Sequence, residues 1–305
     1  MMIRIWSWLL LLASSVFAAG TIQARTLSVD LPLIPAEEQT NRLATTLAVT
    51  ALNNTRSDSD TATLTGKILA NLEISLNPAT HEVAGVHSIE FTGGLVHMSD
   101  LSFTLSYGIL LGKIEARTTG IAGFPSSPSG PGPVVGENFN TIDHMFVFNQ
   151  GSVSAYGTGV MGSLFDPISQ DLSEEPIEAS AETEGILSVE LDNIAGSQAT
   201  YRVYLILPVI IAQEFPVVEG VTASFTGNGT IVASGSITIP VCLLHSDLVG
   251  DDCYVDLSDL AAFSEQWFLS SDQNPCPLLA DLDGQDCLVD LNDLAIFVSE
   301  WLLSE

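Results

Sequence analysis

The chain has 305 residues, 46% of them hydrophobic, which is enough for one large or two modest domains and argues against global disorder. Its 37 acidic residues outnumber 8 basic ones, for a net charge of −29. Nucleic acid and anionic membrane surfaces are bound through clustered Lys and Arg, so the composition argues against both partners. Such an acidic surface suits solubility or the binding of divalent cations.

The N-terminal residues have the pattern of a secretory signal peptide. Arg4 precedes an apolar run, and Val16-Phe17-Ala18 offers a small-residue cleavage site after residue 18, with cleavage after Ala24 as the alternative. A retained membrane anchor is the other interpretation, but the apolar run is shorter than the ~20 residues that span a bilayer. We therefore expect a secreted or cell-surface protein with no membrane span in the mature chain.

Residues 25–240 alternate between apolar and polar side chains with a period of two. The clearest runs are 68–76, 101–105, 187–191 and 237–239, and Gly, Asn, Asp and Pro separate them. Strands with one apolar and one polar face are typical of antiparallel sheets. We predict an all-β domain of roughly 8–12 strands, either a sandwich or a barrel.

Five segments of this domain carry four separate expectations. Residues 37–52 lack strict alternation and predict a short helix, or a loop followed by a strand. The Pro-rich run 125–133 is expected outside the sheet interior, because Pro lacks a donor for the ladder. Residues 166–185 hold seven acids and no base, which predicts a solvated loop. Segments 65–76 and 226–239 share a pattern and are candidates for first and last strands that pair to close a barrel.

No catalytic constellation stands out in residues 25–240. His81, His87, His97 and His144 lack metal-ligand spacing, and the region contains no Cys, no G-x-S-x-G and no Gly-rich phosphate loop. Acids are plentiful enough for glycoside hydrolysis, but nothing selects two of them. We assign no catalytic residue, and a non-catalytic role is the first hypothesis.

Residues 241–305 contain one motif written twice, in copies 242–269 and 276–303. Between 242–268 and 276–302, 15 of 27 positions are identical. All four cysteines lie here, at the same place in each copy, and in an exported protein they predict two disulfides. Pairing within each copy, Cys242 with Cys253 and Cys276 with Cys287, is the first choice. The other two connectivities and a zinc site are the alternatives.

Each copy ends in a helical pattern with apolar residues spaced three or four apart. We expect two short helices that pack on each other through these stripes. A unit this small needs further stabilisation, which two disulfides and two metal ions would supply. The stripes are Leu257, Leu260, Ala261, Ser264, Trp267 and Phe268 in the first copy, and Leu291, Leu294, Ala295, Val298, Trp301 and Leu302 in the second.

The same unit holds fourteen acids and no Lys or Arg, so its charges repel one another. Bound cations would relieve that repulsion, and calcium takes six to eight oxygen ligands from short acidic loops. The alternative is a disulfide-stapled helical pair whose acids are only solvated.

These residues resemble the dockerin type I family, duplicated loop–helix modules that bind calcium and dock onto cohesin domains. The resemblance lies in D-L-V-G-D-D-C-Y-V-D-L-S-D-L-A-A-F from Asp247 and D-L-D-G-Q-D-C-L-V-D-L-N-D-L-A-I-F from Asp281. It implies side-chain ligands at the first, third, fifth, ninth and twelfth loop positions. The matching residues are Asp247, Asp252, Asp256 and Asp259 in the first copy, and Asp281, Asp283, Asp286, Asp290 and Asp293 in the second.

Both copies depart from the family pattern. Each has one extra residue near Asp251 or Gln285, and a Cys stands where the sixth position is normally Gly. The third position of the first copy is Val249, which has no side-chain oxygen, so the second loop is the better calcium candidate. The family's docking pair, typically hydroxyl-bearing, is here Leu257-Ser258 and Leu291-Asn292.

The sequence thus predicts an exported, non-catalytic β domain whose C-terminal dockerin-like module binds Ca²⁺ and docks onto a cohesin-like or cell-surface protein. The first alternative is an extracellular polysaccharide-acting enzyme or carbohydrate-binding protein carried by the same module. The second is a carrier of an apolar ligand, which a hollow β domain would favour.

Overall fold

The computed structural model describes residues 24–37, 40–77, 80–164, 167–179, 183–218, 220–242, 244–249, 253–273, 276–284 and 286–302. The expected signal peptide lies outside these residues. The chain is mainly β and antiparallel, as predicted, with small helices near its C-terminus. It forms two compact units, residues 23–241 and residues from 242 onward, described separately below. No helix in the described part of the chain is long and apolar enough to cross a membrane.

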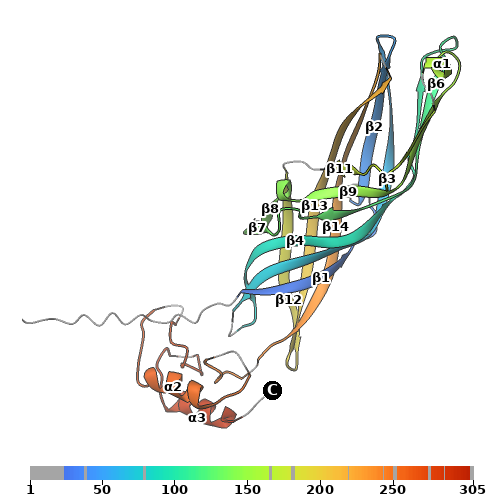
Figure 1. Cartoon of the computed structure of the whole chain (residues 1–305). Helices are drawn as coiled ribbons and strands as arrows, with labels where there is room; N and C mark the ends of the chain where they lie inside the picture. Colours follow the sequence, from blue (N-terminus) through green and yellow to red (C-terminus); the bar gives the residue numbers. More distant parts are fainter. Residues whose placement is uncertain are drawn as a thin grey trace, which may run out of the picture. The chain divides into compact units, whose positions relative to one another are not determined.

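The first unit, the β domain, contains fourteen strands within the described residues (Figure 1). Their number exceeds the predicted 8–12, because β7, β8, β10 and β11 have only three or four residues, too few for a recognisable alternation. The strands are β1 Ala24–Pro32, β2 Arg42–Ala51, β3 Asn54–Leu76, β4 Val83–Met98, β5 Ser102–Ser106, β6 Lys113–Ser126, β7 Gly132–Val135, β8 Asn138–Asn140, β9 Met145–Gly157, β10 Ile168–Asp171, β11 Ile177–Ala179, β12 Glu184–Ala195, β13 Gln198–Val218 and β14 Val221–Pro240. A 3-10 turn, η1 (Thr141–Asp143), and a one-turn helix, α1 (Met161–Leu164), lie between strands.

The strand β3 organises the domain because it changes partner along its 23 residues. Its first part, up to Thr63, pairs with β2, and its second part, from Leu64, pairs with β4. The remaining pairings run β2–β14–β13–β12–β8–β7–β4, so these eight strands form a closed ring. A closed ring corresponds to the barrel rather than the sandwich. The predicted pairing of 65–76 with 226–239 is wrong, because this part of β3 pairs with β1 on one side and with β4 on the other.

Two glycines allow the close approach of β3 and β4 where β3 has just changed partner. Gly66 and Gly94 have φ of 124° and 117°, which L side chains rarely adopt. A Cβ on Gly66 would lie 2.1 Å from the Leu95 carbonyl oxygen, and one on Gly94 would lie 2.4 Å from the Lys67 carbonyl oxygen. A side chain at either position would therefore push the two strands apart.

The segments with separate expectations gave mixed outcomes. Within 37–52 the described residues before Arg42 are irregular and Arg42–Ala51 form β2, which matches one of the two predicted alternatives. The expectation that the Pro-rich run 125–133 lies outside the sheet is wrong at both ends of the run. Pro125 belongs to β6, and Pro133 belongs to β7 and lies opposite Ser88 of β4. The prediction of a loop for the acidic segment 166–185 is also partly wrong. The short strands β10 and β11 lie in this segment, and both pair with β9.

The core follows the predicted alternation, with Ile68, Leu72 and Ile74 of β3 fully buried. No sequence pattern predicted the role of Asn41, a fully buried polar residue with φ of 53°. Its amide donates to the carbonyl oxygens of Ile34 (2.7 Å) and Val232 (2.9 Å), and its Oδ1 accepts from the Val232 N–H (2.8 Å). Asn41 thereby joins the segment after β1 to β14.

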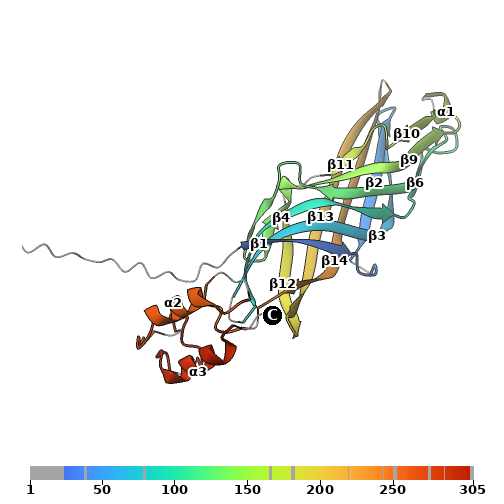
Figure 2. The ribbon, with the colours of Figure 1, turned by 60° about the horizontal axis from the view of Figure 1, so that its bottom comes forward.

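The second unit, the C-terminal module, is built on α2 (Leu257–Glu265) and α3 (Leu291–Glu300), which lie side by side (Figure 2). The rings of Phe263 and Phe297 meet at the centre with centroids 5.0 Å apart. The helices pack on each other as expected, but not through the whole of the predicted stripes, because Leu257 and Leu291 are 72% and 68% exposed. The buried face instead includes Asp259 and Phe263 of α2 and Asp293 and Phe297 of α3.

Replacing Asn41 with Ala should destabilise the β domain by about 2–4 kcal/mol, because three hydrogen bonds to the backbone are lost at once, two of them buried. Urea unfolding of the full chain measures this cost. Asn228→Ala, an exposed Asn on β14, is the matched control and should cost much less. Equal costs for the two variants would show that the Asn41 bonds contribute no net stability.

Candidate metal centre

Each helix of the module begins at a pair of carboxylates that close a capping box. In α2 the Asp256 side chain accepts the Ser258 N–H (2.6 Å), and Asp259 Oδ2 accepts the Asp256 N–H (2.9 Å). In α3 Asp290 and Asp293 repeat both bonds. Carboxylates here satisfy amide donors that a helix N-terminus otherwise leaves unpaired, and they match the sign of the helix dipole.

The second oxygen of each inner carboxylate holds the preceding loop. Asp259 Oδ1 accepts the N–H groups of Leu248 and Val249, each at 2.8 Å. Asp293 Oδ1 accepts the Asp283 N–H at 3.0 Å. Both side chains are almost fully buried, with exposures of 1% and 0%. Each therefore fixes an acidic loop to the helix that follows it.

The second loop brings three further carboxylates together. Asp281, Asp283 and Asp286 each offer an oxygen, and these oxygens lie within 4.8 Å of one another. Burial raises the pKa of Asp281, and the negative charges of Asp293 and Asp283 add to the rise, while the Gly284 N–H opposes it. Three carboxylates that offer oxygens at one place are the donor set that suits a hard divalent cation.

The fit of the predicted ligands to calcium differs between the copies. In the second copy Asp281, Asp283 and Asp286, which the resemblance assigns to the first, third and fifth loop positions, form the group of three carboxylates. The residues of the ninth and twelfth positions, Asp290 and Asp293, lie at the start of α3. In the first copy Asp256 and Asp259 occupy the same places as these two. Asp252 lies outside the described residues, and Val249 contributes no side-chain oxygen.

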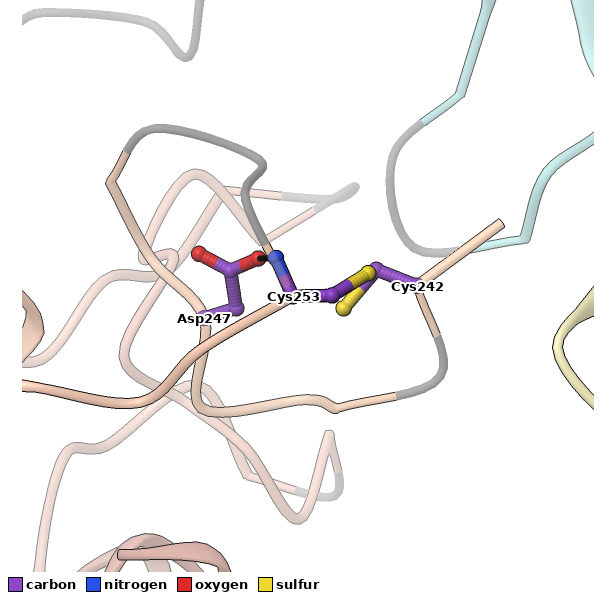
Figure 3. Close-up of side chains that lie close together, drawn as sticks. All are labelled: Cys242, Asp247 and Cys253. Atoms are coloured by element: carbon purple, nitrogen blue, oxygen red, sulfur yellow. Dashed lines mark hydrogen bonds between the residues drawn. The ribbon is translucent and has the colours of Figure 1, made fainter. Parts of the chain in front are cut away.

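The first loop has a mixed donor set. Cys242, Asp247 and Cys253 offer ligand atoms within 4.8 Å of one another. Figure 3 shows the two sulfur atoms next to each other and the Asp247 carboxylate beside the Cys253 nitrogen, which donates to its Oδ2 at 2.9 Å. Sulfur is a poor ligand for calcium, so the described part of this loop fits that ion less well than the second loop does.

The equivalent cysteines of the second copy, Cys276 and Cys287, form a disulfide, which confirms the predicted pairing within that copy. Cys242 and Cys253 are thiols in the structure, so their pairing stays a prediction. Burial, followed by a hydrogen bond with Cys253, raises the pKa of the Cys242 thiol.

Backbone hydrogen bonds between the two copies, called cross-copy bonds below, were not predicted by any sequence pattern. The Phe268 N–H donates to the Val289 carbonyl oxygen, and the Leu302 N–H donates to that of Val255, both at 3.0 Å. These equivalent bonds connect the end of each copy to the residue just before the helix of the other. Glu300 of α3 also accepts the Ser246 N–H at 2.7 Å. The two loops therefore form one structural unit.

The chain matches no protein-family model and no curated protein. Among solved structures it is similar to that of Ail, the attachment invasion locus protein of Yersinia pestis, in complex with the heparin analogue sucrose octasulfate. That match has 10% sequence identity and covers 69% of this chain and 100% of the other, with a TM-score of 0.21. A likeness this weak carries no argument about fold or function.

The neighbouring thiols Cys242 and Cys253 should form a second disulfide once the protein is exposed to an oxidising environment. Thiol titration of the denatured, oxidised full chain should then find no free thiol. Peptide mapping should find both linkages within the copies. A linkage between the copies, or two persistent thiols, would contradict the prediction, and Cys276–Cys287 serves as the internal control.

Proposed function

We propose that this chain is an exported, non-catalytic protein whose C-terminal module binds calcium and docks the β domain onto an extracellular or cell-surface protein. The observation that carries the proposal is the group of Asp281, Asp283 and Asp286 in a unit that contains no Lys or Arg. A calcium ion there would receive oxygen ligands and would offset both the burial and the neighbouring negative charges that raise the pKa of Asp281.

The residues around this group have separable roles in the proposal. Asp281, Asp283 and Asp286 hold the ion, since their oxygens already face one another. Asp293 adds negative charge beside Asp281 and also fixes the loop to α3 through backbone N–H groups. Calcium bound in the second loop would therefore stabilise the start of α3 and, through the cross-copy bonds, the first copy as well.

An exposed apolar face supports docking onto a protein. Leu257 and Leu291 occupy the same position in α2 and α3 and are largely exposed, as are Phe268 and Leu302 after the two helices. Exposed large apolar side chains that recur at equivalent positions are typical of a binding surface. The leucine positions are also those that the dockerin resemblance assigns to partner contact. A cohesin-like partner is the one we propose.

Calcium should raise the unfolding temperature of the module. Tryptophan fluorescence reports on it selectively, because a chain cleaved after residue 18 keeps only Trp267 and Trp301. At calcium concentrations about 100-fold above the dissociation constant, the expected stabilisation is about 2.7 kcal/mol. Asp283→Asn combined with Asp286→Asn should remove most of this response, whereas the exposed control Asp272→Asn should keep it. A wild-type midpoint that millimolar calcium does not move would refute the calcium site.

Docking should depend on both calcium and the leucine pair. The immobilised full chain, incubated with exported proteins of the same cells, should retain a partner that a calcium chelator releases. Leu257→Ser combined with Leu291→Ser should abolish retention, because the apolar contact is lost. The control is Ile109→Ser combined with Leu110→Ser, two exposed apolar residues of the β domain. Retention lost only in this control would place the docking surface on the β domain instead.

A further inference from the structure

The β domain contains a cavity of about 410 Å³ between two walls of strands. One wall consists of residues from β2, β13 and β14, and the other consists mainly of residues from β5, β6, β9, β10 and β11. Phe103 and Phe225 approach each other from the two walls, with ring centroids 6.2 Å apart. A cavity of about 150 Å³ lined by Leu, Ile and Phe holds benzene, so this one has room for a molecule roughly two to three times as large.

The cavity exists because small residues occur on both of its walls. Ala116 of β6 lies directly opposite Ala155 of β9 in the strand register, and Ala223 lies on the β14 wall. Bulky side chains at these places would fill the space, as they do in the rest of the core. Empty volume inside a domain destabilises the fold roughly in proportion to its size. A ligand that fills the cavity would therefore stabilise the β domain.

The lining offers an occupant mostly hydrocarbon. Of the described lining residues, all but Arg117, Thr118 and Gln170 are apolar. Two of these three side chains already have partners in the chain. The Thr118 hydroxyl oxygen accepts the Leu101 N–H at 2.8 Å, and the Gln170 amide donates to the Glu175 carbonyl oxygen at 3.2 Å. Contacts with the walls therefore favour a molecule that is itself mostly hydrocarbon.

The third polar residue, Arg117, brings no charge into the cavity. It is exposed between the buried Ala116 and Thr118, so strand alternation places its side chain on the outer face of β6. No other Lys, Arg, Asp or Glu is among the described lining residues. An ionised group inside the cavity would lose its hydration without gaining a counter-charge. The cavity therefore favours an uncharged occupant over an anion or a cation.

A seam between β11 and β13 gives access to the cavity. The strand β13 pairs with β12 only as far as Ile206, and no backbone ladder joins its later residues to β11 in the described part of the domain. The Gln213 amide donates to the Glu178 carbonyl oxygen across this seam at 3.0 Å. Ile177 of β11 and Ile211 of β13 both line the cavity. The wall can therefore open here without the loss of a β ladder.

We propose that this cavity binds an uncharged, predominantly hydrocarbon molecule of roughly 15 non-hydrogen atoms, a size scaled from the benzene cavity. The molecule packs between the two walls against Phe103, Phe225 and Ile211. Its binding energy comes from the burial of apolar surface, and no charged contact fixes its orientation. This inference rests on the β domain alone and is independent of calcium binding by the module.

The ligand class is tested with a pair of fluorescent dyes that differ in charge. Phenylnaphthylamine is uncharged, and anilinonaphthalene sulfonate is the same ring system with an anionic group. The full chain, stripped of bound small molecules and kept in a calcium chelator, should bind the uncharged dye at least tenfold more tightly, because the lining cannot pair the sulfonate. Calorimetry of that binding should show a negative heat-capacity change. Equal or tighter binding of the sulfonate would overturn the uncharged class.

The site is tested by filling the cavity. Ala155→Phe should weaken binding of the uncharged dye at least tenfold, and the smaller change Ala116→Leu should weaken it several-fold, because both side chains take up existing space. Ala44→Phe, at an exposed position of β2, should bind the dye as the wild type does.

The exposed face of the module is the competing dye site. Leu257→Ser combined with Leu291→Ser should leave dye binding unchanged, and its loss would overturn the cavity as the site. Undiminished binding to the folded cavity variants, or no binding to the wild type, would overturn the proposal as well. If Ala155→Phe does not fold, Ala116→Leu decides.

Discussion

The hydrogen bonds of the buried Asp259 and Asp293 carboxylates determine how the C-terminal module is arranged. Each carboxylate accepts N–H groups from its loop with one oxygen and from the helix N-terminus with the other. Because the acid must face inward, the helix is rotated so that the phenylalanine four residues later is buried as well. The same rotation exposes Leu257 and Leu291 on the opposite face. One constraint thus sets both the core of the module and its proposed docking surface.

The carboxylates of the module divide between two environments. Asp256, Asp259, Asp290 and Asp293 are stabilised by backbone N–H groups at the helix starts, and this does not require an ion. Asp281 and Asp286 also accept backbone N–H groups, but their oxygens lie within 4.8 Å of one another and of an Asp283 oxygen, which is where we propose the cation. The folded helix pair and the proposed calcium site are therefore coupled but distinct. The bonds at the helix starts hold the core of the module together whether or not an ion is bound.

The sequence predicted more of the chain's periodic elements than of the contacts between them. Strand alternation and the repeated loop–helix pattern depend on neighbouring residues, and both are present as expected. The buried helix face was predicted only in part. Leu260, Trp267, Leu294 and Trp301 of the predicted stripes pack against the core, but Leu257 and Leu291 do not. Hydropathy places an Asp such as Asp259 on the outside, whereas a capping bond draws it inward. The partner change of β3 and the bonds of Asn41 depend on strands distant in sequence.

The distribution of basic residues separates the two units by charge. Of the eight Lys and Arg, one precedes residue 25, seven lie in residues 25–240, and none follows. In the β domain Lys67, Lys113 and Arg202 each pair with an acid. In the module His245 lies beside Glu300, and the other acids have no Lys or Arg to pair with. Hydrogen bonds and an external cation are therefore the means by which the module can offset its acids, which is why we propose the cation there.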